Sequence, residues 1–113
     1  MNEKFEKFYN EILENNRFDE DIVELWETML KSAIEYTNIR ANWSLMTTKE
    51  KVENDKHRTS LHDSFINNSK IFVRYCEQNQ RTLSLKKFLE RTDRKEIGDF
   101  ANYIVFKEAI KNR

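Results

Sequence analysis

The two histidines, His57 and His62, are the side chains best suited to proton transfer near neutral pH, because imidazole titrates there. Asp63 directly follows the second of them. The only other histidine is five residues away, so the sequence offers no separate, distant histidine to complete a metal centre with this pair. His62 also falls at the edge of an apolar helical stripe, beside Phe65. Two interpretations stay open: a hydrogen-bonded structural histidine, or a direct role in a site.

Carboxylates form the second candidate group, because the oxygen atoms of Glu and Asp are the ligands that Mg²⁺ prefers. Two short E-x-x-E motifs, Glu24–Glu27 and Glu50–Glu53, are separated by 22 residues. This pair resembles the two acidic motifs of all-helical nucleoside triphosphate pyrophosphohydrolases. The resemblance covers eight positions, and it departs from the family at Glu53, where the family has Asp. It implies that Glu24, Glu27, Glu50 and Glu53 hold Mg²⁺ between facing helices. The alternative is a solvated acidic face or a partner-binding patch.

A basic segment spans residues 81–95 and contains six Lys or Arg against two acidic residues. Its basic residues are Arg81, Lys86, Lys87, Arg91, Arg94 and Lys95. Clustered bases can contact phosphates, so a nucleic-acid-binding accessory protein is one hypothesis. The whole chain is neutral, however, with a pI of about 6.7, whereas nucleic-acid-binding domains usually have a pI above about 9.

Other catalytic and cofactor motifs are missing from the sequence. The single cysteine, Cys76, lies on an apolar stripe, where a thiol is usually inert filler. The single glycine, Gly98, excludes both the dinucleotide-binding fingerprint and the Walker loop, which need several glycines. We therefore assign no catalytic residue and expect no cofactor.

The elements that would position these residues are helices. With one glycine and no proline, the chain lacks the turn residues that all-β folds need. Apolar periodicity and capping residues predict helices over residues 2–15, from Asp19 for about six turns, from a Thr47–Glu50 capping box to residue 76, from Ser84 to Leu89, and over 93–111. We expect an all-α fold, a single domain over residues 1–113 that forms a bundle of four longer helices plus a short one. Apolar residues wrap most of the last helix, which predicts that it is the central one.

Two segments in the second half of the chain, RTSLHDSFI at 58–66 and RKEIGDFANYI at 94–104, resemble a family of small all-helical bacterial proteins with no assigned function. The resemblance implies a helical bundle and carries no catalytic residue. It groups Arg58, His62, Arg94 and Asp99, if the helices that carry them lie side by side. Such a group would be a ligand site or a polar network that fixes helix register.

The charge distribution gives the leading hypothesis for function. Residues 1–55 contain 13 acidic and 7 basic residues, and residues 56–113 contain 7 and 13, although the net charge is zero. This asymmetry favours a non-catalytic protein–protein interaction module, with an acidic N-terminal face and a basic C-terminal face, whose partner is another protein or a second copy in a homo-oligomer. No signal peptide and no apolar run of membrane-spanning length is found, so we expect a cytoplasmic protein without membrane contact.

Overall fold

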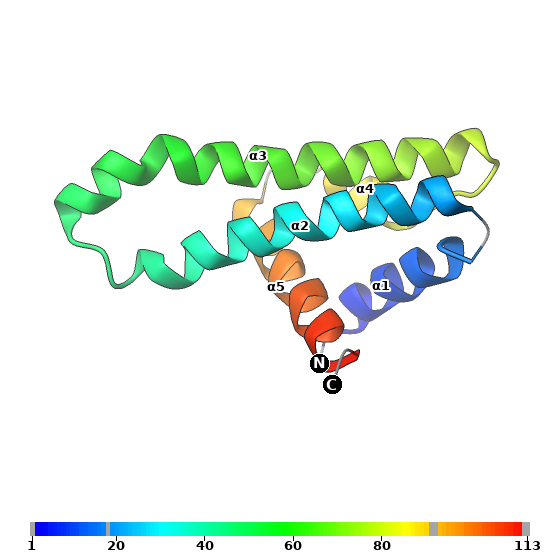
Figure 1. Cartoon of the computed structure of the whole chain (residues 1–113), viewed down its shortest axis with the longest axis horizontal. Helices are drawn as coiled ribbons and strands as arrows, with labels where there is room; N and C mark the ends of the chain where they lie inside the picture. The colour runs from blue at the N-terminus through cyan, green and yellow to red at the C-terminus, as the bar shows by residue number, and fades with distance from the viewer. Residues whose placement is uncertain (1, 18, 91–92, 112–113) are drawn as a thin grey trace.

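The computed structural model describes residues 2–17, 19–90 and 93–111, and these residues form helices without any strand. The helices are α1 (Glu3–Asn15), α2 (Glu20–Trp43), α3 (Thr48–Gln78), α4 (Leu85–Leu89) and α5 (Arg94–Lys111) (Figure 1). This arrangement confirms the predicted all-α fold of four longer helices and a short one. None of the helices in the described ranges is long and apolar enough to cross a membrane.

Side-chain caps set where the two longest helices begin. The Asp19 carboxylate accepts a hydrogen bond from the backbone N–H of Asp21 at 2.8 Å, which caps α2. Thr47 and Glu50 form the predicted capping box of α3, in which each side chain accepts a hydrogen bond from the other residue's backbone N–H. These bonds satisfy N–H groups that have no partner within the helix.

α2 and α3 run antiparallel as a long hairpin that defines the longest axis of the molecule (Figure 1). α3 has 31 residues, and at 1.5 Å per residue it is about 46 Å long, close to the largest extent of the molecule, 47 Å. The end of the hairpin projects beyond the other helices and exposes Leu45 and Val52, whose exposed fractions are 82% and 74%.

Aromatic rings join the remaining helices to the hairpin. Phe100 of α5 is fully buried, and its ring centroid lies 5.4 Å from that of Phe5 in α1 and 5.7 Å from that of Phe88 in α4. The ring of Phe65 in α3 lies 6.2 Å from that of Phe100. Edge and tilted ring contacts of this kind are favourable beyond the area that they bury. Phe100 is therefore where four helices meet.

The prediction that the last helix is central is wrong for its C-terminal half. Phe106 and Ile110 of α5 are 57% and 45% exposed, although the sequence pattern is apolar all round the helix. α2 instead packs against both α3 and α5. An apolar pattern identifies residues that can be buried, and the number of neighbouring helices decides which of them are.

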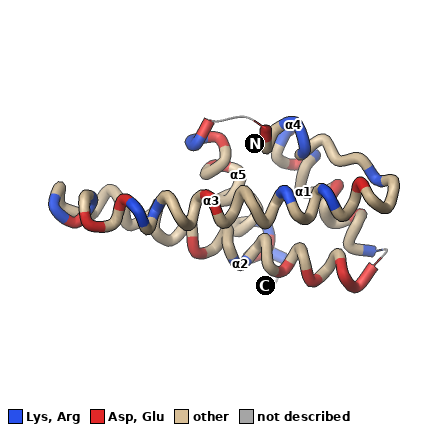
Figure 2. The backbone as a smooth tube through the Cα atoms, turned by 90° about the horizontal axis from the view of Figure 1, so that it is seen from above, with Lys and Arg blue, Asp and Glu red and all other residues tan. Residues whose placement is uncertain are grey.

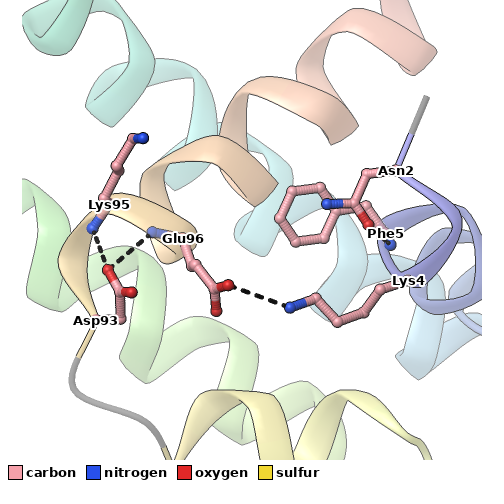
Figure 3. Close-up of polar contacts among 6 residues, drawn as sticks. All are labelled: Asn2, Lys4, Phe5, Asp93, Lys95 and Glu96. Carbon is pink, nitrogen blue, oxygen red and sulfur yellow. Dashed lines mark hydrogen bonds and ion pairs between the residues drawn. The ribbon is translucent and has the colours of Figure 1, made fainter.

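The start of α5 is fixed from two sides, as Figure 3 shows. The Asp93 carboxylate accepts hydrogen bonds from the backbone N–H groups of Lys95 and Glu96, at 3.0 and 3.2 Å. The Glu96 carboxylate accepts a hydrogen bond from the ammonium of Lys4 in α1 at 3.4 Å. These contacts position the first turn of α5, which carries Arg94.

The predicted cap of α4 is wrong. Ser84 makes no side-chain cap and has helical backbone angles, φ −59° and ψ −28°, whereas a capping residue is usually extended. Its backbone N–H and its hydroxyl instead donate to the Glu11 carboxylate, at 2.9 and 3.1 Å. The Ser84 hydroxyl therefore bonds to a charged acceptor on α1 rather than to the backbone of α4.

Candidate functional site

Arginine side chains from α2, α3 and α5 lie near enough to Tyr36 for their charges to act on the pKa of its hydroxyl. Tyr36 is only 4% exposed. Burial raises the pKa of its hydroxyl, the positive charges of Arg40, Arg94 and Arg58 act in the opposite direction, and Asp99 adds to the rise. We call these five residues the Tyr36 cluster. They come from different helices, so the cluster exists only in the folded chain.

Arg40 enters the cluster from α2 and lies against α5 at Gly98. A Cβ atom at position 98 would overlap Cζ of the Arg40 guanidinium. The guanidinium reaches Asp99 at 3.5 Å and lies 5.9 Å from the centre of the Tyr36 ring. The glycine at position 98 therefore makes room for the Arg40 guanidinium.

Arg58 enters from α3, and its guanidinium stacks over the indole of Trp43, with Cζ 4.0 Å from the ring centre. It also reaches Asp55 at 3.4 Å, but the Asp55 side chain is 61% exposed, so solvent screens this pair strongly. The Nε atom of Arg58 is buried without a hydrogen-bond partner among the described residues. Stacking on Trp43 thus holds the guanidinium in place.

Arg94 is exposed and links α5 to α3 by donating a hydrogen bond to the Thr59 hydroxyl at 3.1 Å. His62 is 7% exposed, with its ring 5.4 Å from the Tyr36 ring in an edge contact and its Nδ1 atom 3.1 Å from the Asp63 carboxylate. The residues grouped from the sequence, Arg58, His62, Arg94 and Asp99, therefore all lie around Tyr36.

Sequence reasoning missed Tyr36, Arg40 and Trp43, which complete this region. Residue spacing gave Tyr36 and Arg40 no role, because both lie far along the chain from residues 58–62 and 94–99. Gly98 was a usable signal, since a lone glycine inside a helix often marks a close approach by another group.

The Glu24–Glu27 and Glu50–Glu53 motifs do not face each other. The first lies early in α2 and the second in the first turns of α3, at the projecting end of the hairpin (Figure 1). The helix rises about 24 Å between Glu27 and Trp43 alone. Within the described ranges, no group of three or more His, Cys, Asp or Glu side chains could hold a metal ion. The arrangement that the pyrophosphohydrolase resemblance implied, with Mg²⁺ held between facing motifs, is absent from this fold.

The basic segment divides between internal contacts and the surface. The ammonium of Lys86 pairs with Glu77 of α3 at 2.6 Å while remaining half exposed, and Arg81 lies near enough to Asp19 to lower its pKa. Lys87 and Lys95 are exposed. Arg91 lies outside the described residues.

The acidic residues divide in the same way. Glu11 and Asp19 accept hydrogen bonds from Ser84 and from the Tyr75 hydroxyl, whereas exposed carboxylates follow one another along α2. We call Glu20, Glu24 and Glu27 the acidic surface, and Lys86, Lys87 and Lys95 the basic surface. Figure 2 shows the acidic stretch of α2 on one side of α3, and α4 and the start of α5 on the other.

Cys76 is fully buried in the core, as its place on the apolar stripe predicts. Burial raises the pKa of its thiol to about 11, so the thiol is protonated at neutral pH. A buried, protonated thiol is a poor nucleophile.

Comparisons of this chain with protein-family models, with curated proteins and with solved structures found no match.

Proposed function

We propose that this chain is a non-catalytic protein-interaction module that associates through its opposed acidic and basic surfaces, with a second copy of itself as the simplest partner. The observation that carries this proposal is that the acidic stretch of α2 lies on one side of α3, and α4 and the start of α5, which carry the basic surface, lie on the other (Figure 2). Each surface consists of exposed side chains, so charge complementarity is available without unfolding any element.

The placement of the surfaces dictates the geometry of such an association. In a two-fold dimer the same patch of each subunit meets itself. An acidic surface that lies on the opposite side of α3 from the basic surface of the same molecule meets its complement only in a head-to-tail arrangement. Such an arrangement produces rings or open chains of subunits, and it weakens as salt screens the charges.

Sedimentation velocity at low and at high salt tests this proposal. We expect species larger than a dimer at low salt, and their dissociation as the ionic strength increases. A variant with Glu20→Gln, Glu24→Gln and Glu27→Gln is expected to remain monomeric at low salt. The control variant carries Glu53→Gln and Asp55→Asn. It is expected to associate normally, because these acids lie outside the acidic surface. A native chain that is monomeric at every salt concentration would contradict the proposal.

The two alternative functions receive no support from a specific contact. The pyrophosphohydrolase needs facing acidic motifs, which the fold separates. Nucleic-acid binding needs a continuous basic surface, and the exposed acids Glu90 and Asp93 lie among the bases of this segment. We also propose a cytoplasmic location, because Cys76 is a buried free thiol, and that compartment keeps thiols reduced.

A further inference from the structure

We propose that the Tyr36 cluster is an anion-binding site that takes a phosphate group, either as the free ion or as a phosphomonoester. Its ligands would be the guanidinium groups of Arg40, Arg58 and Arg94. This inference is independent of the proposed self-association, because it uses the junction of α2, α3 and α5 rather than the acidic or basic surface.

The first support is an excess of positive charge and hydrogen-bond donors at this junction. A guanidinium carries five N–H donors, and the contacts described here use few of them. Arg40 reaches Asp99 at 3.5 Å, and Arg94 donates to Thr59 at 3.1 Å. Asp99 offsets one of the positive charges close to Tyr36, while Asp55 and Asp63 are each 61% exposed and strongly screened. A multiply charged oxyanion would satisfy the remaining donors.

The second support is that packing holds the guanidinium groups in place before any ligand arrives. Arg40 lies on the bare backbone of Gly98, and Arg58 stacks on Trp43. Their side chains are only 25% and 29% exposed. Ordering long side chains in advance lowers the entropy cost of binding.

The third support is the type of donor. The planar fork of arginine fits two oxygens of a phosphate at once, whereas lysine acts as a point charge. The residues that meet here from α2, α3 and α5 are arginines. Phosphate is therefore a better fit than a halide, and its larger number of oxygens and higher charge suit three guanidinium groups better than a single carboxylate does.

Isothermal titration calorimetry with inorganic phosphate, at fixed ionic strength set with chloride, tests the site directly. Phosphoserine forms a second arm, because tighter binding of the ester would assign the ligand to a larger phosphorylated molecule. We expect saturable binding in both arms. Tighter binding of inorganic phosphate would instead identify the free ion as the ligand, and either order supports the site.

Two variants separate an anion site from a polar network that merely fixes helix register. Arg94 is exposed, so Arg94→Gln is expected to fold normally and to bind phosphate roughly tenfold more weakly, since a hydrogen bond to a charged group is worth about that factor. Gly98→Ala forces the Arg40 guanidinium to move, yet it improves helix propensity. We expect unchanged or higher thermal stability together with weaker phosphate binding. If the cluster served only to fix helix register, Gly98→Ala would lower the thermal stability instead.

The matched control is Arg74→Gln, which removes an exposed arginine from the same helix as Arg58 at a distance from the cluster. Its phosphate affinity is expected to equal that of the native chain. The proposal is overturned by the absence of saturable binding to the native chain, by native affinity in Arg94→Gln or Gly98→Ala, or by an equal loss in Arg74→Gln.

Discussion

At the scale of single residues, Asp19 shows how one carboxylate joins local and long-range structure. It caps α2 and also accepts a hydrogen bond from the hydroxyl of Tyr75, which is 56 residues away, at 2.7 Å. The Tyr75 hydrogen bond is the largest cause of the lowered pKa of Asp19, and the Asp21 backbone bond comes next. The same contact raises the pKa of Tyr75 to about 12.

Replacing Tyr75 by Phe is expected to raise the pKa of Asp19 towards its ordinary value, because the carboxylate loses its main hydrogen-bond donor. A folded-state pKa below the unfolded one gives stability that is present above the unfolded pKa and lost as pH falls through the folded pKa. In Tyr75→Phe the folded-state pKa lies closer to the unfolded one, so the protein loses less stability as the pH falls. Carbon-13 NMR titration of the carboxyl group measures the pKa.

The control for this prediction is Tyr103→Phe, which also removes one phenol hydroxyl. That hydroxyl is buried without a hydrogen-bond partner among the described residues, and Asp19 is expected to titrate as in the native chain. An unchanged Asp19 pKa in Tyr75→Phe would show that the backbone cap alone lowers it.

The sequence allowed part of the Tyr36 cluster, and its neighbour His62, to be predicted. Arg58 and His62 are four residues apart on one helix, so their proximity follows from helix geometry. Tyr36 and Arg40 join them only through the packing of α2 on α3 and α5, which residue spacing does not encode. Side-chain stacking, such as that of Arg58 on Trp43, is likewise decided by tertiary structure.

At the scale of elements, the first turns of α3 depend on their N-terminal cap, because they lie at the projecting end of the hairpin. The structure confirms the capping box that the Thr47–Glu50 spacing predicts. The boundaries of the helices were predictable because caps and periodicity are local. The exposure of the second half of α5 was not, because it depends on which helices pass alongside.

Replacing Thr47 by Ala is expected to cost about 1 kcal/mol, the usual value of a lost N-cap. The loss is local, because this end of α3 projects beyond the other helices. Hydrogen exchange of the backbone amides in residues 48–54 is expected to become faster, while exchange near Phe72 changes little. Chemical denaturation measures the overall loss.

Thr48→Ala provides the comparison, since it makes the same chemical change one residue later, at an exposed position outside the cap. It is expected to be neutral or slightly stabilising, because Ala has the higher helix propensity. Equal destabilisation by the two substitutions would mean that the hydroxyl of Thr47 contributes nothing specific.

At the scale of the whole molecule, the aromatic cluster around Phe100 holds α1, α4 and α5 to the hairpin. Phe100→Ala is expected to destabilise the fold by about 3–5 kcal/mol, because it removes a fully buried ring and leaves a cavity. Urea denaturation measures this loss. Phe106→Ala, in the same helix but 57% exposed, is expected to change stability by at most about 0.5 kcal/mol. Similar losses in both variants would contradict the assigned core.

The difference in charge between the two halves of the chain is also a property of the whole molecule. Some of these charged residues act inside the fold, where the Glu11 carboxylate accepts a hydrogen bond from Ser84 and Arg81 lies near Asp19. The remainder is exposed as the acidic and basic surfaces on opposite sides of α3 (Figure 2). The difference between the two halves of the chain was visible in the sequence, but the opposition of the surfaces needed the fold.

Mixing two variants tests the head-to-tail association most directly. One variant lacks the acidic surface (Glu20→Gln, Glu24→Gln, Glu27→Gln), and the other lacks the basic surface (Lys86→Gln, Lys87→Gln, Lys95→Gln). In sedimentation velocity at low salt, each is expected to be monomeric alone, because a head-to-tail contact needs both surfaces. Their equimolar mixture is expected to form a one-to-one dimer that grows no further, whereas the native chain forms larger species. A mixture that stays monomeric, or a variant that associates alone as the native chain does, would contradict the account.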